Sequence, residues 1–431
     1  MRKRAAAVFA AVVFFGAQQL MADTLIFVGG NKAAGKAAAE KAGGKWVKSL
    51  TKAFKKAAKV KQGRIELRLA EGKYKGDLGS GAYKLPKFDA LGATLVISGG
   101  WYQDFTKRDP FGHPSWIVTD QMRSAPLWTF ERNSKLGGLI IDGLVWDSAA
   151  SNKYDAKTNS LLIGKSCTHP FLKLNYLETD LLSFRNSVFM NSANRVVETL
   201  IRAHTPKARI EFKNCIFFNN RIPLKLDSAR FRNKPAEILV DHCSFLLNWP
   251  YNPDPGTGNR GAIELGPSDA AKVVRITNNL FWANIGGAIQ AAFTKLPALY
   301  INNNDFIGNG LLHGKTEPGA VAMIVTAGGR MQDIDLGTIE DVDAVEEAEG
   351  NVSIDPALGI SIGNPKMVDA SKVKVEKSWE NSVRSILGMN LQGGRVAIKD
   401  YAPRKEYSPA NPPFPKNPKA AKYGASPKLV E

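Results

Sequence analysis

The chain has 431 residues, of which 44% are hydrophobic and 23% charged, so it can bury a large core. Its three cysteines exclude a scaffold held mainly by disulfides. The formal net charge of +18 favours an anionic partner: acidic polysaccharide, an anionic cell surface or nucleic acid. Non-specific attraction to anions would also follow from that charge.

The first 22 residues have the features of a secretory signal. A basic segment, Met1–Arg4, precedes an apolar run of 13 residues, Ala5–Ala17, and Leu20-Met21-Ala22 is a suitable cleavage site. The apolar run is too short to span a bilayer, and no later segment is long and apolar enough to do so. We therefore expect a secreted, periplasmic or cell-envelope protein with no transmembrane anchor. Export also makes a nucleic-acid partner the least favoured of the three anions.

Residues 23–64 are predicted to form an N-terminal strand and a capping helix. Thr24–Val28 has the composition of a strand, and Gly29–Gly44 that of a loop or weak helix. Trp46–Ala58 has apolar residues at helical spacing with lysines between them. This amphipathic helix either caps the open end of a repeat array, which we favour, or lies on a membrane surface.

One short pattern is repeated between Leu182 and Asn309. Five copies have two alternating apolar residues, then a polar residue, then an aromatic; they begin 28, 28, 36 and 25 residues apart, and a sixth begins at Leu139. The first polar column contains Asn186, Asn214, His242, Asn278 and Asn303, and a second contains Ser192, Asn220, Asn248, Asn284 and Asn309. These intervals predict a solenoid of stacked parallel strands, with an asparagine ladder at the turn that holds the first polar column.

The segments around this repeat resemble a known group. Lys48–Ala53, Ile65–Leu69 and Glu71–Tyr74 look like the opening cap and first coil of the secreted right-handed parallel β-helix proteins of the pectin-lyase-like superfamily, and Ile141–Leu144 is similar to their coil motif. The resemblance implies an all-β fold, a single-stranded right-handed parallel β-helix over residues 65–330. It leaves the activity open, because that superfamily includes lyases, hydrolases, epimerases, adhesins and non-enzymes.

The repeat pattern ends near residue 330. Residues 331–400 are predicted to be an acidic loop and the exit from the helix; the carboxylates of Asp333–Glu349 either bind Ca²⁺ or, as we favour, form a solvated loop that faces the basic body. Residues 401–431, rich in proline and lysine, are predicted to be extended along the body. Cys215 and Cys243 share a column, so they are either bridged or two buried thiols, with Cys167 left over.

No strong catalytic motif is present, so candidate sites come from the columns of the solenoid. The outward column before the first polar residue contains Asp142, Arg185, Lys213, Asp241, Thr277 and Asn302. In a polysaccharide lyase, Lys213 would be the base, with Arg185 and Arg221 neutralising the uronate and Asp241 orienting the base or holding a cation. The alternative is a surface ladder of ion pairs without catalysis.

A second column contains Arg195, Arg221 and Arg260, which would bind carboxylate or sulfate groups or be compensated by Glu198 and Glu264. The longer interval before Asn278 contains Trp249 and Tyr251, aromatic residues that would stack on sugar rings or fold onto the body.

Together these features predict a monomeric secreted protein that binds, and in the stronger version cleaves, an acidic polysaccharide. The alternative is a non-catalytic surface or matrix protein. We assign no cofactor.

Overall fold

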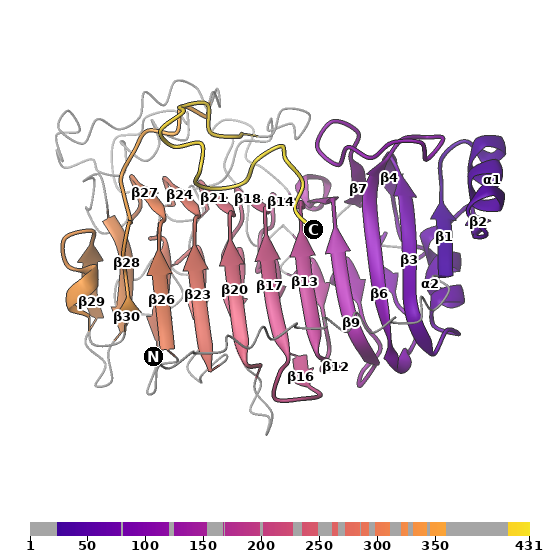
Figure 1. Ribbon diagram of the computed structural model, residues 1–431, viewed down its shortest axis with the longest axis horizontal. Coiled ribbons are helices and arrows are strands. Elements are labelled where there is room, and N and C mark those ends of the chain that lie inside the picture. The colour runs from indigo at the N-terminus through magenta and orange to yellow at the C-terminus, as the bar shows by residue number, and fades with distance from the viewer. Residues whose placement is uncertain are drawn as a thin grey trace, which may run out of the picture.

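Each coil of the chain contributes one short strand to each of three parallel sheets, which makes the fold a parallel β-helix solenoid (Figure 1). This fold confirms the prediction from the repeat. The computed structural model describes residues 24–78, 81–119, 125–152, 167, 169–198, 201–226, 235–248, 261–265, 272–284, 286–292, 298–310, 320–325, 331–342, 345–358 and 413–431.

The first sheet has thirteen strands and runs the length of the solenoid. Its main path is β2 (Lys45–Val47), β1 (Thr24–Val28), β3 (Gln62–Ala70), β6 (Asp89–Trp101), β9 (Lys135–Asp142), β13 (Leu181–Arg185), β17 (Arg209–Lys213), β20 (Glu237–Asp241), β23 (Val273–Thr277), β26 (Ala298–Asn302) and β30 (Val345–Glu347). Two further strands pair beside this path, β12 (Leu177–Thr179) and β16 (Ile201–Ala203).

Two other sheets complete the wall. The second sheet contains β4 (Gly72–Tyr74), β7 (Ser115–Val118), β10 (Leu144–Asp147), β14 (Val188–Met190), β18 (Ile216–Phe218), β21 (Ser244–Leu246), β24 (Leu280–Trp282) and β27 (Asp305–Ile307). The third contains β5 (Tyr83–Lys84), β8 (Trp128–Thr129), β11 (Leu172–Lys173), β15 (Val197–Glu198), β19 (Leu224–Leu226), β22 (Ile263–Leu265), β25 (Ile289–Ala292), β28 (Ala320–Val325) and β29 (Met331–Asp335). Only β29 runs antiparallel to its neighbour among these paired strands.

Stacking in register builds the core. The rings of Phe189, Phe217, Phe245, Phe281 and Phe306 follow one another with centroids 4.8–5.0 Å apart and interplanar angles of 5–8°. These residues are the aromatics of the repeat, and all are buried. Successive parallel strands lie about 4.8 Å apart, so identical side chains in one column are brought to stacking distance.

The first polar column occupies the sharp turn between the first and second sheets. Asn186, Asn214, His242, Asn278 and Asn303 have positive φ angles of 48–55°. Asparagine tolerates this left-handed conformation better than most residues, which explains its recurrence in the column. The histidine therefore occupies a position selected by backbone geometry.

The second polar column is a buried ladder. The amide of Asn220 donates to the carbonyl of Phe189, and the side-chain oxygen of Asn248 accepts the Asn220 backbone N–H at 3.0 Å. Asn284 and Asn309 continue the same bonds. The sequence predicted a ladder in the first polar column, where the Asn214 amide donates to the side-chain oxygen of Asn186 at 2.8 Å; the longer ladder of the second column was not predicted.

The N-terminal end is closed by two helices. In α2 (Leu50–Ala57), Leu50, Ala53, Phe54 and Ala57 are buried in the core, so the capping interpretation is confirmed and the membrane-surface one is wrong. The helix is shorter than the predicted Trp46–Ala58, because Trp46 and Val47 belong to strand β2. Residues 32–41, predicted as loop or weak helix, form α1 (Lys32–Lys41), whose first backbone N–H groups donate to Asn31.

The other end departs from the prediction. The acidic stretch is not one loop: it contributes β29, the 3₁₀ helix η4 (Ile339–Asp341) and β30, which extends the first sheet beyond residue 330. A second 3₁₀ helix, η1 (Ala149–Ser151), lies in an earlier coil. Apolar residues of the stretch, including Ile339 and Val342, join the core, which explains why it is ordered against the last coil.

The C-terminal residues 413–431 return along the body, as predicted. Figure 1 shows this yellow segment crossing the ends of the strands. Asn186 and Asn214 donate their side-chain amides to the carbonyls of Val430 and Lys428. The turn asparagines therefore also hold the tail.

All three cysteines are free and buried, so the interpretation of Cys215 and Cys243 as buried thiols is confirmed. No helix among the described residues has the length and hydrophobicity needed to cross a bilayer.

Candidate functional site

The predicted outward column exists. Strand pairing places Asp142 beside Arg185, Arg185 beside Lys213 and Lys213 beside Asp241, all at the ends of first-sheet strands. Thr277 and Asn302 continue the column. The structure thus brings together the three residues that sequence analysis assigned to catalysis.

A buried carboxylate joins these cations. Glu211 lies two residues before Lys213 on β17, so both side chains project from the same face. One carboxylate oxygen is 3.2 Å from Lys213 Nζ and 3.6 Å from an Arg185 guanidinium nitrogen, and Ser183 donates to the same oxygen. Glu211 is only 4% exposed, so its charge must be compensated locally.

A second carboxylate extends the cluster. Arg209 contacts Glu211 at 3.5 Å and Glu237, on the next strand, at 3.0 Å. The other oxygen of Glu237 accepts from Arg275 at 2.9 Å, and that guanidinium lies 4.1 Å from the centre of the Tyr300 ring. The cation cluster, Arg185, Arg209, Lys213 and Arg275, therefore shares two carboxylates.

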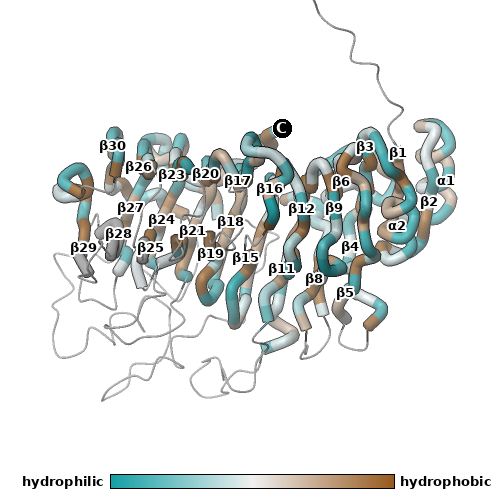
Figure 2. Tube along the Cα trace, turned by 90° about the horizontal axis from the view of Figure 1, so that it is seen from below, coloured by the Kyte–Doolittle hydropathy of each residue, from teal (hydrophilic) through white to brown (hydrophobic). Residues whose placement is uncertain are grey.

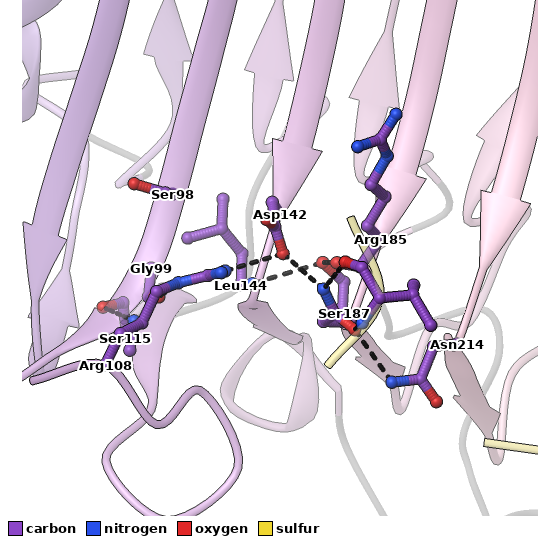
Figure 3. Close-up of polar contacts among 12 residues, drawn as sticks. Ser98, Gly99, Arg108, Ser115, Asp142, Leu144, Arg185, Ser187 and Asn214 are labelled. Atoms are coloured by element: carbon purple, nitrogen blue, oxygen red, sulfur yellow. Dashed lines mark hydrogen bonds and ion pairs between the residues drawn. The ribbon is translucent and has the colours of Figure 1, made fainter. Parts of the chain in front are cut away.

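The N-terminal side of the column is closed by Asp142. Figure 3 shows Arg108 reaching from the loop after β6 to Asp142, where the ion pair measures 2.6 Å. Asn186 donates to the same carboxylate oxygen at 2.8 Å. Asp142 is thereby fully engaged, which limits the region of surplus positive charge to the coils that follow.

The C-terminal side of the column is closed by Asp241. Burial disfavours the Asp241 carboxylate, but hydrogen bonds from His242, Asn278 and Thr277 outweigh it and lower the pKa of Asp241. His242 Nδ1 lies 3.0 Å from the carboxylate, and this hydrogen bond raises the pKa of His242. Asp241 and His242 therefore form an ion pair in which the histidine is more readily protonated than usual.

The second predicted column is less regular. Arg195 lies two residues before Val197, whereas Arg221 lies three residues before Leu224, the strand partner of Val197. Both arginines belong to the turn between the second and third sheets, so the structure does not place Arg221 on the face that carries Lys213. Arg221 is buried.

Three of the predicted site residues, Arg260, Trp249 and Tyr251, lie outside the described residues. Glu264, proposed to compensate the arginines, is buried on β22, and the side chain of Glu198 is outside the described part.

Sequence analysis missed Glu211, Glu237, Arg209 and Arg275. A signal was available, because Glu211 and Arg275 are the residue between the two alternating apolar positions of their repeat copies, and such positions face outward in a strand with one buried face. Arg108 had no such signal, since its loop lies outside the repeat.

Within the described part of the chain, no three His, Cys, Asp or Glu side chains come close enough to hold a metal ion. No protein-family model, curated protein or solved structure matches this chain. The parallel β-helix is therefore established from the strands, and the resemblance to the pectin-lyase-like superfamily stays a prediction.

Proposed function

We propose that the outward face of the first sheet binds an acidic polysaccharide. The observation that carries this proposal is the cation cluster, in which four cations on the three strands β13, β17 and β23 share two carboxylates. Guanidinium groups match carboxylate and sulfate oxygens in pairs, and partial burial strengthens such contacts. A polymer lying along the solenoid axis would meet cations on three of the four consecutive coils from β13 to β23.

The tail borders this face. Residues 424–430 follow the turn directly beyond Arg185 and Lys213, where Ser426 and Val430 donate backbone N–H groups to Asn214 and Asn186. A ligand on the cluster is thus limited on one side by the chain's own C-terminus. This border favours a molecule that extends along the solenoid over one that crosses it.

Binding accounts for Lys213 better than proton abstraction does. Its 3.2 Å contact with Glu211 is one that an ammonium makes, whereas a general base needs the neutral amine. The cleavage prediction is tested by incubation with pectate, alginate or chondroitin sulfate while absorbance of unsaturated uronate is followed. A signal that Lys213→Ala abolishes would establish it.

Binding is tested with the double variant Arg185→Gln, Lys213→Gln. We expect its affinity for the same glycans, measured by calorimetry at moderate salt, to fall about tenfold, because two charge-assisted contacts are lost. The matched control is Lys84→Gln, Lys173→Gln, which removes two exposed cations of the third sheet.

An equal loss of affinity in the control would mean that the glycans respond only to the net charge of the protein and not to the cation cluster. Absence of binding to every glycan would instead favour the non-catalytic structural or adhesive function.

A further inference from the structure

The N-terminal end of the solenoid carries an unusual concentration of positive charge. Residues 24–61 contain ten lysines and one glutamate, a net charge of +9. All ten lysines are exposed, and they form what we call the lysine cap: Lys32, Lys36, Lys41, Lys45, Lys48, Lys52, Lys55, Lys56, Lys59 and Lys61.

Ion pairs among the described residues do not neutralise the lysine cap. None of its side chains forms an ion pair with any carboxylate in the described part of the chain. Because α2 directs Leu50, Ala53 and Phe54 into the core, its lysines are left on the outer side. Helix α2 therefore covers the end of the core and also gives this end of the solenoid part of its positive charge.

The opposite end has the opposite charge. Residues 333–349 contain eight carboxylates and no lysine or arginine, a net charge of −8. The 3₁₀ helix η4 packs on this end as α2 packs on the other: Ile339 is buried in the core, while Glu340 and Asp341 are exposed. Six carboxylates with described side chains form the acidic end: Asp335, Glu340, Asp341, Glu346, Glu347 and Glu349.

These two surfaces lie at the two ends of an elongated molecule. Figures 1 and 2 both place α1, α2 and β2 at one end and β29 and β30 at the other. The strands β2 and β30 are the terminal strands of the same sheet; β2 includes the exposed Lys45, and β30 the exposed Glu346 and Glu347. A second copy, aligned with the first, would thus present carboxylates to lysines.

We propose that the lysine cap binds the acidic end of a second copy of this chain, so that solenoids associate head to tail. The contact joins two different surfaces, and both remain free on the terminal copies, so it generates a linear chain of copies rather than a closed dimer. The proposal replaces the monomer expected from the sequence. It is independent of polysaccharide binding on the sheet face.

The association is electrostatic and therefore depends on salt. Leu78 is the only large apolar side chain that is strongly exposed among the described residues, so neither end offers an apolar patch. Charges on separate molecules attract over about 30 Å at about 0.01 M salt but only about 3 Å at about 1 M. Assembly should form at the lower ionic strength and dissociate at the higher one.

The experiment is sedimentation velocity on the full chain, with three side-chain charges reversed at one end or the other, which weakens the net charge of that end. The cap variant is Lys52→Glu, Lys55→Glu, Lys56→Glu, and the acidic-end variant is Glu340→Lys, Asp341→Lys, Glu346→Lys. A control with the same charge change as the cap variant, Lys107→Glu, Lys173→Glu, Lys207→Glu, alters exposed lysines between the ends. Circular dichroism verifies that each variant is folded.

We expect the wild type and the control to form oligomers at low salt, and each end variant to be at least tenfold weaker in self-association. A monomeric wild type at low salt would overturn the proposal. So would an equal loss in the control. Binding of a monomeric wild type to phosphatidylglycerol vesicles through the cap would assign that surface to lipid instead.

Discussion

The inner and outer faces of the same strands follow different rules. Along β17, Ile210 and Phe212 point into the core and repeat the residue types of the neighbouring coils, whereas Arg209, Glu211 and Lys213 on the outer face do not. Inside, identical rings gain by stacking on one another. Outside, identical charges would repel, and the neighbouring cations Arg185 and Lys213 are instead held by the carboxylate of Glu211 between them. Residue types therefore repeat from coil to coil in the interior, whereas they differ from coil to coil on the exterior.

The largest expected effect lies inside. Phe217→Ala removes a ring that stacks at 5.0 Å on Phe189 and at 4.8 Å on Phe245, and leaves a cavity in a sealed core. We expect the free energy of unfolding to fall by about 3–5 kcal/mol in chemical denaturation. Leu78→Ala, at a side chain 46% exposed, is the control and should change it by less than about 1 kcal/mol. Similar losses in the two variants would contradict the view that the stack stabilises the coils.

A smaller effect is expected at Asp305, an ionisable residue buried in the interior. Asp305 begins β27 inside the last coil, where it accepts the Ile354 N–H at 2.8 Å. Burial raises its pKa to about 7, despite that hydrogen bond. Since an unfolded aspartate titrates near about 4, the folded state holds this proton more tightly, and stability should fall as the pH rises from about 4 to about 7.

Asp305→Asn should remove this pH dependence. We expect it to raise the free energy of unfolding by about 2 kcal/mol at pH 8, while changing it little at pH 4, because asparagine keeps the acceptor and never ionises. Denaturation at the two pH values is the measurement. An equal change at both would mean that packing, not ionisation, decides the role of Asp305.

The smallest effect lies on the outer face. Asp241 raises the pKa of His242, and His242 contributes to lowering the pKa of Asp241, so this pair stabilises the fold fully between about pH 4 and about pH 6.5. Its contribution is lost as the pH rises through the folded pKa of the histidine and as the pH falls through the lowered pKa of the aspartate. Asp241→Asn should lower the pKa of His242, seen by NMR titration, and cost less than about 1 kcal/mol because the pair is partly exposed. An unchanged titration would show that the ion pair does not form in solution.

The sequence by itself determined the solenoid, the asparagine turn of the first polar column, the capping helix and the membership of the outward column. Each of these is recorded in a regular spacing of residues, and helix formation or the stacking of coils brings residues at that spacing onto one face. Asn214 could be recognised in this way because the same left-handed turn recurs at this position in five coils.

Only the tertiary structure decided which charges meet. The pairing of Arg108 with Asp142 and of Asn186 with Val430 joins coils of the repeat to segments outside it. The separation of the lysine cap from the acidic end, which the sequence had suggested would fold back onto the basic body, follows from the length of the stacked coils. Long-range electrostatics depends on where the chain ends up in space, and no local pattern records that position.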